Sequence, residues 1–331
     1  MPNTTPTSNL AFDLVRVTEA AALSAGRMMG RGDKNGADKA AVDAMRVMLN
    51  SINIRGTVVI GEGEKDEAPM LYNGEVLGTG VGPEVDIAVD PIEGTRPLAY
   101  GLWNSISTVA LAPRGTMFNP GPFVYMNKIA VGPSAIHHVD IDAPVDYNLT
   151  KVAKAKGVKV EDLTVVVLDR PRHEKLINEI RAAGARIRLI PDGDVAGALM
   201  TAMGDNTADM LMGIGGTPEG VLAAAGLRCM GGEIVGKLYA RDQRELDLAK
   251  ELGVDVNKPL TMNDLISSDN VFFAATGITT GDYLRGVSYF KDGARTDSVV
   301  MRGLSGTVRR VISTHKLSKL MRHSAIKYTG Q

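Results

Sequence analysis

Apolar residues recur about every 3.6 positions in the first part of the chain, a spacing that predicts amphipathic helices. We expect a first helix over residues 10–29, ended by Gly30 and Gly32, with an apolar face formed by Leu10, Leu14, Val17, Ala21 and Met28. A second helix is expected to open at Asp38 and to run to about Asn50. Short apolar runs then predict strands over residues 57–60, 84–90 and 105–112.

From about residue 140, apolar runs of strand length alternate with segments of helical periodicity. Strands are expected over residues 163–168, 185–190 and 210–214, and helices over 174–183, over an Ala-rich stretch after Asp194 and over 221–230. This alternation is typical of an α/β protein with a largely parallel sheet.

The change of rhythm also favours two parts of the chain. We expect an N-terminal metal-binding α/β half over residues 1–140 and a C-terminal α/β half over residues 141–331 that completes the substrate site. One continuous domain is the alternative. The charged residues 239–270 are expected to form a surface excursion, before strands over 271–275 and 307–313.

The composition is that of a soluble globular protein and excludes several classes of function. Lysine and arginine total 37 against 38 for aspartate and glutamate, and this net charge of −1 argues against a nucleic-acid partner held by bulk positive charge. The single cysteine, Cys229, excludes an intrachain disulfide framework and any multi-cysteine metal site. No apolar run approaches the roughly 20 residues that a membrane span needs. Residues 1–9 also lack the apolar core of a signal peptide. We therefore expect a cytoplasmic protein without a membrane partner.

Acidic residues follow several of the expected strands, namely Glu62, Asp90, Asp192 and Glu219. Because ligands of open α/β sheets bind beyond the carboxyl ends of the strands, we expect these residues to meet in one acidic site. The set Asp38, Glu62, Asp90, Glu93 and Glu219 would be self-repelling, and Mg²⁺ or Mn²⁺ is the simplest compensation.

Each of these carboxylates also has a simpler interpretation when it is taken alone. Asp38 could cap a helix, Glu62 could lie in a solvated turn and Asp90 could start a turn before Pro91. Glu219 could be a favourable charge in the first turn of a helix. Their shared position after strands favours the metal site for the group.

The segment Asp90-Pro91-Ile92-Glu93-Gly94-Thr95 places two carboxylates and a hydroxyl in one tight turn. Clustered carboxylate oxygens suit hard cations, and Gly94 permits a close approach of phosphate to the backbone. The Thr95 hydroxyl could position a water, or help to deprotonate it, in metal-assisted hydrolysis. It could equally cap the structure that follows, and the two roles are compatible.

Anion contacts are expected from Arg170 and Arg172, which closely follow the strand over residues 163–168. Guanidinium groups bind phosphate in a bidentate manner, although two solvated arginines at a helix start are the simpler interpretation. The glycine-rich residues 213–220 could cradle phosphate through backbone N–H groups, but they lack the lysine of a P-loop. Tyr125 is either a core residue or a ligand contact.

These motifs resemble those of a known family. The turn from Asp90 to Thr95 is similar to the metal signature of the lithium-sensitive phosphatase superfamily, which usually has aspartate where this chain has Glu93. Further strings narrow the resemblance, at residues 30–35, 60–64 with 66–72, 170–173, 191–196 and 215–220. Taken in order, they resemble the bacterial class II fructose-1,6-bisphosphatases over about residues 10–315.

The resemblance implies a layered α/β/α/β/α sandwich of the sugar phosphatase and inositol monophosphatase type. It implies metal-dependent hydrolysis of the 1-phosphate of fructose 1,6-bisphosphate to fructose 6-phosphate in gluconeogenesis, by a homo-oligomer that is often a tetramer. Divalent Mg²⁺ or Mn²⁺ would be held by Asp38, Glu62, Asp90, Glu93 and Glu219, and Thr95, Glu93 and Asp90 would be catalytic. Substrate would contact Glu93, Gly94, Thr95, Tyr125, Arg170, Arg172, Asp192, Asp194 and Gly216.

Three alternatives stay open from the sequence. Another sugar bisphosphate, such as sedoheptulose 1,7-bisphosphate, could be the substrate, alone or beside fructose 1,6-bisphosphate. An inositol phosphate is a more distant option. A non-catalytic sugar-phosphate sensor is disfavoured, because Thr95 and the whole acidic set are present.

Overall fold

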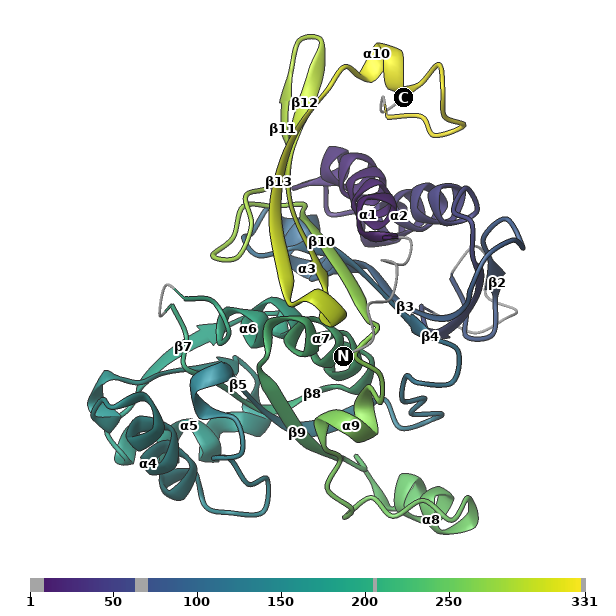
Figure 1. Cartoon of the computed structure of the whole chain (residues 1–331). Coiled ribbons are helices and arrows are strands. Elements are labelled where there is room, and N and C mark those ends of the chain that lie inside the picture. The colour runs from purple at the N-terminus through teal and green to yellow at the C-terminus, as the bar shows by residue number, and fades with distance from the viewer. Residues whose placement is uncertain (1–8, 63–70, 205–206, 329–331) are drawn as a thin grey trace.

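The computed structural model describes residues 9–62, 71–204 and 207–328, in which helices pack between and around two β-sheets (Figure 1). Residues 63–70, which include part of the strings that carry the resemblance, lie outside the described residues. The first sheet orders its strands β11-β12-β10-β4-β3-β1-β2, and β13 pairs with β12. Its strands are β1 (Arg55–Ile60), β2 (Val76–Leu77), β3 (Glu84–Glu93), β4 (Ile106–Pro113), β10 (Phe272–Gly277), β11 (Ser288–Phe290), β12 (Gly293–Arg302) and β13 (Thr307–His315).

The second sheet has the order β7-β6-β8-β5-β9. Its strands are β5 (Tyr125–Val131), β6 (Thr164–Leu168), β7 (Arg186–Ile190), β8 (Met210–Gly216) and β9 (Glu233–Leu238). Strand β6 pairs in parallel with β7 and β8, whereas β5 pairs antiparallel with β8 and β9. The predicted strands after residue 140 are confirmed, but both sheets are mixed. Parallel pairing is confined to β6 with β7 and β8, and to β1 with β3 in the first sheet, so the expectation of a largely parallel sheet holds only in part.

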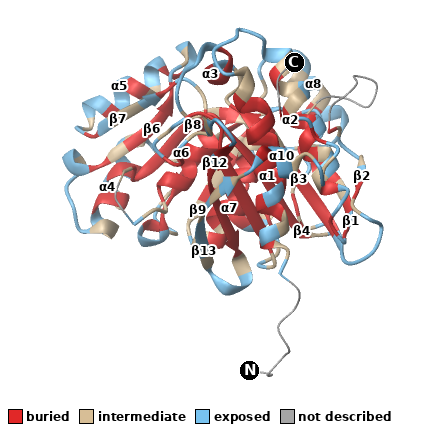
Figure 2. Ribbon diagram, turned by 90° about the horizontal axis from the view of Figure 1, so that it is seen from above, coloured by how far each residue is buried: buried red, intermediate tan, exposed pale blue. Residues whose placement is uncertain are grey.

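Helices lie on both faces of each sheet. Helices α1 (Ala11–Ala25) and α2 (Lys34–Leu49) pack on one face of the first sheet, and α6 (Asp194–Met200) and α7 (Thr217–Met230) contact strands of the second sheet. Helix α7 also contacts β3, β4, β10 and β12, and is buried in the interior (Figure 2). The other helices are α3 (Thr95–Tyr100), α4 (Val145–Lys156), α5 (Glu174–Ala182), α8 (Gln243–Glu251), α9 (Met262–Leu265) and α10 (Leu317–Leu320). Short 3-10 turns cover Gly26–Met28, Pro133–Ala135, Val160–Asp162, Pro171–His173 and Gly303–Ser305.

Alternation along the strands explains why the first sheet is covered twice. In β4, Val109 and Leu111 belong to the cluster with α1 and α2, whereas Ala110 and Ala112 belong to the cluster with α7. Successive side chains of a strand point to opposite faces, so an apolar run of this kind buries both faces. The unbroken apolar run of residues 109–112 is the sequence signal for this arrangement.

Among the element boundaries that differ from the sequence-based expectation, two have a clear local cause. Helix α2 begins at Lys34, because the Asp33 side chain accepts the Gly36 N–H and caps it. Asp38 therefore lies inside the helix, and its interpretation as a cap is wrong. Strand β3 continues past Pro91, because the register with β4 shifts between Asp90 and Glu93 and so needs no proline N–H.

The charged residues 239–270 are only partly a surface excursion. Helix α8 is largely exposed, as expected, but Leu265 and Ile266 are fully buried in the cluster around α7. The predicted strands over 271–275 and 307–313 correspond to β10 and β13. Among the described residues, no helix combines the length and the apolar character needed to cross a bilayer.

Candidate active site

The turn after β3 holds Asp90 and Glu93 at the point where the pairing with β4 shifts. The Asp90 Oδ1 accepts the Ile92 N–H at 3.1 Å, which fixes the turn around Pro91. Gly94 has φ 87°, a backbone conformation that a side chain would strain, and it leads directly into α3. Glu93 is buried, and its Oε1 accepts the Val195 N–H from α6 at 2.5 Å. The first sheet and α6 therefore meet at Glu93.

Thr95 and Asp38 are joined by a hydrogen bond between distant parts of the chain. The Thr95 Oγ1 lies 3.0 Å from Asp38 Oδ1 and 3.2 Å from the Ile92 carbonyl oxygen. Burial raises the pKa of Asp38, although the bond from Thr95 and the charge of Lys34 act in the opposite direction. The structure thus brings the predicted hydroxyl directly to one of the predicted metal-binding carboxylates.

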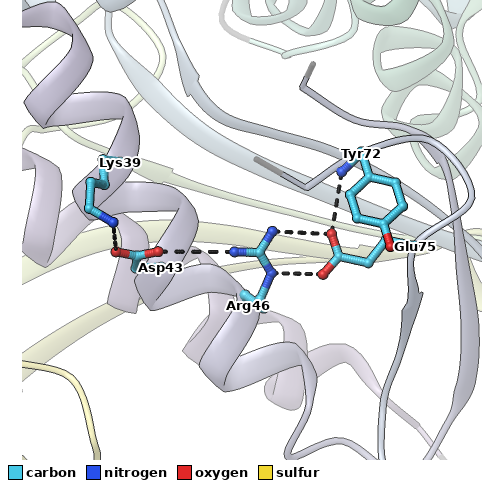
Figure 3. Close-up of polar contacts among 5 residues, drawn as sticks. All are labelled: Lys39, Asp43, Arg46, Tyr72 and Glu75. Atoms are coloured by element: carbon cyan, nitrogen blue, oxygen red, sulfur yellow. Dashed lines mark hydrogen bonds and ion pairs between the residues drawn. The ribbon is translucent and has the colours of Figure 1, made fainter. Parts of the chain in front are cut away.

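An ion-pair network connects α2, which carries Asp38, with the segment that lies next to Glu62. Arg46 binds Glu75 through Nε to Oε1 at 2.7 Å and Nη2 to Oε2 at 3.1 Å (Figure 3). Glu75 also accepts the Tyr72 N–H at 3.3 Å, and the Glu62 N–H donates to the Leu71 carbonyl at 2.8 Å. The network therefore sets the position of Glu62 relative to α2.

The other four predicted metal ligands have raised pKa values for the same physical reason as Asp38. Burial is the largest cause for Glu62, Asp90, Glu93 and Glu219, because a charged carboxylate loses its hydration there. Repulsion by neighbouring carboxylates adds to it, from Asp38 and Glu219 on Glu62 and from Glu62 and Glu93 on Asp90. The pKa of Glu62 reaches about 7. These side chains therefore form one interacting acidic group.

The carboxylates of Glu219 and Asp194 lie close against the backbone of two glycines. A Cβ on Gly216 would overlap the Glu219 carboxylate, and a Cβ on Gly215 would overlap Asp194 Oδ2. These two glycines end β8, directly before α7. The glycine-rich loop thus makes room for carboxylates beside its backbone, whereas the sequence had suggested a cradle for phosphate.

Lys128 is a buried cation that was not predicted from the sequence. Its side chain is 1% exposed, and its Nζ lies 2.6 Å from Asp194 Oδ2 and 2.9 Å from the Gly216 carbonyl oxygen. Repulsion from Asp194 is the second cause of the raised pKa of Glu219, after burial, and Lys128 opposes it. One feature of the sequence could have revealed this buried lysine. It directly precedes the apolar residues Ile129-Ala130-Val131 of β5, and a charged residue in such a strand needs a partner.

The predicted substrate contacts Arg170 and Asp192 bind each other through Arg170 Nη2 and Asp192 Oδ1. Arg172 instead donates from Nε and Nη2 to the Ile214 carbonyl at 3.1 and 2.8 Å. Tyr125 pairs in register with Gly216, and its ring lies 5.4 Å from the Arg172 Cζ. The structure therefore places Arg172, Tyr125 and Gly216 together, while the Arg170 guanidinium already has a carboxylate partner.

His173 holds two backbone segments together through its ring nitrogens. Its Nδ1 lies 2.7 Å from the Leu168 carbonyl oxygen, and its Nε2 accepts the Ile214 N–H at 2.8 Å. These partners require a neutral ring with the proton on Nδ1, and burial lowers the pKa of His173 accordingly. The ring joins the end of β6 to β8 next to Arg172.

The donor set fits a divalent cation. Glu93 Oε2 is buried and has no hydrogen-bond partner among the described residues. The raised pKa values of its neighbours are those of carboxylates that lack a counter-charge. Across residues 9–62, 71–204 and 207–328, no three His, Cys, Asp or Glu side chains are grouped closely enough to hold a metal ion. A cation would therefore draw these oxygens closer together.

Comparison with known proteins identifies the class. The sequence model of the family described as bacterial fructose-1,6-bisphosphatase, glpX-encoded, matches residues 8–315. The chain belongs to this family of hydrolases. It is 48% identical over 323 residues to fructose-1,6-bisphosphatase 1 class 2 of Escherichia coli strain K12, covering 94% of this chain and 96% of that protein. Fructose-1,6-bisphosphatase class 2 of Shigella flexneri is equally similar over the same shares of both chains.

Proposed function

We propose that this protein removes the 1-phosphate of fructose 1,6-bisphosphate by metal-dependent hydrolysis. The observation that carries the proposal is the hydrogen bond between Thr95 and Asp38 beside an acidic group with raised pKa values. The family membership supplies the substrate class. The products would be fructose 6-phosphate and phosphate.

The residues that would hold Mg²⁺ or Mn²⁺ are Asp38, Glu62, Asp90, Glu93 and Glu219. Bound divalent ions would lower the pKa of a water towards neutrality and offset charge on the phosphoryl oxygens. Burial and mutual repulsion oppose ionisation of these five carboxyl groups, and divalent ions would offset both effects. Glu93 Oε2 is buried and has no hydrogen-bond partner among the described residues, so a cation would satisfy this oxygen directly.

Thr95 would orient the attacking water. Its hydroxyl proton is directed to Asp38, so the oxygen lone pairs remain to accept a hydrogen bond from the water. Asp38, with its raised pKa, can take the proton that the water gives up through the Thr95 hydroxyl. Gly94 leaves the backbone next to Thr95 open to a phosphate.

The sugar would contact Asp192 and Asp194. Each carboxylate is held by a cation, Asp192 by Arg170 and Asp194 by Lys128, so their free lone pairs have fixed directions. Carboxylates accept hydrogen bonds from hydroxyl groups but repel phosphate. Tyr125, Arg172 and Gly216 would lie towards the phosphate that is not cleaved.

Three broader features belong to the same proposal. The layers of helices and sheets would be the α/β/α/β/α sandwich of the sugar phosphatases. Residues 1–140 and 141–331 would act jointly, since Glu93 and Val195 meet at the site. The protein would work as a cytoplasmic homo-oligomer, such as a tetramer.

The test is phosphate release from fructose 1,6-bisphosphate with Mg²⁺, with Mn²⁺ and with chelator, in the wild type and in Thr95→Ala. We expect metal-dependent release that falls about a hundredfold or more in Thr95→Ala, because an oriented proton acceptor is lost. Thr79→Ala is the matched control, since Thr79 Oγ1 donates to Asn53 Oδ1 at the same 3.0 Å on an exposed loop. Full activity in Thr95→Ala would remove Thr95 from the mechanism. If no metal supported phosphate release, fructose 1,6-bisphosphate would be excluded as the substrate.

A further inference from the structure

Two arginines lie against the ring of Tyr125. The Cζ of Arg172 is 5.4 Å and the Cζ of Arg241 is 5.5 Å from the ring centroid. Arg172 follows β6, whereas Arg241 follows β9, so the two come from distant parts of the chain. Contacts of guanidinium groups with tyrosine at these distances are attractive and hold all three side chains near one another.

The backbone explains why Arg241 reaches this position. Tyr125 begins β5, and the Tyr239 N–H donates to the Tyr125 carbonyl at 2.8 Å. The chain therefore leaves β9 alongside the start of β5. On the other side of β5, Tyr125 pairs with Gly216 of β8. Gly216 in turn lies against the Glu219 carboxylate. Arg241 thus stands at the edge of the acidic site and is separated from it by one strand.

The donors around Tyr125 are available to an anion. Arg172 has a neutral carbonyl as its partner, and within the described residues no carboxylate pairs with it. Among the described residues, the Tyr125 hydroxyl likewise has no hydrogen-bond partner. Arg170 is paired with Asp192 and Arg241 with Glu245, so the charge without a carboxylate partner at this ring is that of Arg172. A phosphate next to Tyr125 would therefore meet one phenol and the unpaired charge of Arg172.

Arg241 is held in place by Glu245. The Nε donates to Glu245 Oε1 at 2.7 Å, and Glu245 Oε2 accepts the Arg241 N–H at 2.7 Å. The guanidinium is half exposed, and its Nη2 also lies 2.5 Å from Glu245 Oε1, which leaves Nη1 without a partner among the described residues. The pairing fixes the direction of the group without using all of its donors, as in bidentate anion sites.

We propose that Arg241 is a specificity-determining residue that binds, together with Arg172 and Tyr125, the phosphate of the substrate that is not cleaved. The inference deepens the proposed function and rests on it. A sugar that carries two phosphates gains this contact, whereas a sugar with only the cleaved phosphate does not. Arg241 thereby favours bisphosphates over monophosphates.

The experiment compares fructose 1,6-bisphosphate with fructose 1-phosphate as substrates of Arg241→Ala. We expect the KM for the bisphosphate to rise about tenfold, the usual cost of a lost charge-assisted hydrogen bond at an accessible site. The kcat for the bisphosphate and the KM for the monophosphate should change less than about twofold. Arg241→Lys should lie between the two, because a lysine keeps the charge but not the fork.

Arg244→Ala is the matched control, since it removes another exposed arginine from the same helix start. Equal KM effects on both substrates, no effect, or the same effect in Arg244→Ala would overturn the inference. If the wild type cleaves neither substrate, the proposed function is wrong, but the role of Arg241 in binding phosphate can still be tested. Calorimetric binding of fructose 6-phosphate then decides the inference. Weaker binding to Arg241→Ala than to Arg244→Ala supports it, and equal binding overturns it.

Discussion

At the scale of single residues, burial controls the protonation of the acidic group. A carboxyl group whose pKa is higher in the folded state than in the unfolded state binds more protons in the folded state between the two values. For Glu62 this window runs from the ordinary 4.5 to about 7, and Asp90 and Glu93 shift in the same direction. Through this window the acidic group therefore lowers the unfolding free energy of the metal-free protein as the pH rises, while the buried His173, whose pKa is lowered, acts in the opposite direction.

We predict this fall for protein treated with chelator, with Glu62 alone contributing at most about 3 kcal/mol. Urea unfolding between pH 5 and pH 8 measures it. Glu62→Gln, which cannot titrate, should make the dependence less steep. Mn²⁺ should weaken or reverse it, because metal binds the deprotonated carboxylates. A pH dependence that is the same in Glu62→Gln as in the metal-free wild type would contradict the raised pKa of Glu62.

At the scale of elements, the last described segment of the chain stabilises the helix that carries Asp38. Leu317, Ile326 and Tyr328 are buried in a cluster with Ala20 and Leu23 of α1 and Ala44 of α2. The Arg27 Nε also donates to the Tyr328 carbonyl at 3.2 Å. Figure 1 shows this segment next to α1. The family match ends at residue 315, so this packing lies outside the part that the family model covers.

Ile326→Ala should lower the unfolding free energy by about 2–3 kcal/mol, because it removes a buried side chain and leaves a cavity. Lys327→Ala changes the exposed neighbour and should stay within about 0.5 kcal/mol of the wild type. Denaturant unfolding compares the two variants. Equal stabilities would show that the segment contributes nothing to holding α1 and α2.

The sequence predicted elements better than it predicted their contacts. Apolar runs located β3, β4, β6 and α5, because local periodicity follows from the burial of one or both faces. Lys128 and Arg241 were missed, because their partners Asp194 and Tyr125 are distant in sequence and neither residue belongs to a motif. The helix cap at Asp33 was also missed, although a capping aspartate is a local signal, because Asp38 five residues later attracted the same interpretation.

At the scale of the whole molecule, α7 is the element that both sheets share. It contacts β3, β4, β10 and β12 of the first sheet and β5, β8 and β9 of the second, and it presents Glu219 in its first turn. Its Cys229 is 2% exposed, and burial raises the pKa of the thiol to about 12. This cysteine therefore reports on the separation of α7 from its neighbours.

Native protein should react with a thiol reagent far more slowly than urea-unfolded protein, because both access and thiolate formation require opening. Absorbance of the released thiol measures the rate. Mn²⁺ with fructose 6-phosphate should slow labelling further, since ligands that bind only the folded state suppress opening. Labelling of the native protein at the rate of the unfolded chain would place Cys229 at an accessible surface.

The order in which strands join the first sheet has a consequence for synthesis. Strand β10 pairs with β4, yet the chain between Pro113 and Phe272 first builds the whole second sheet. A ribosome needs roughly ten to thirty seconds to make a stretch of that length. Throughout this interval β4 offers an unpaired apolar edge to other nascent chains. The period of greatest risk for aggregation therefore ends only when the last quarter of the polypeptide emerges, so cover by a chaperone is most needed for the half that is made first.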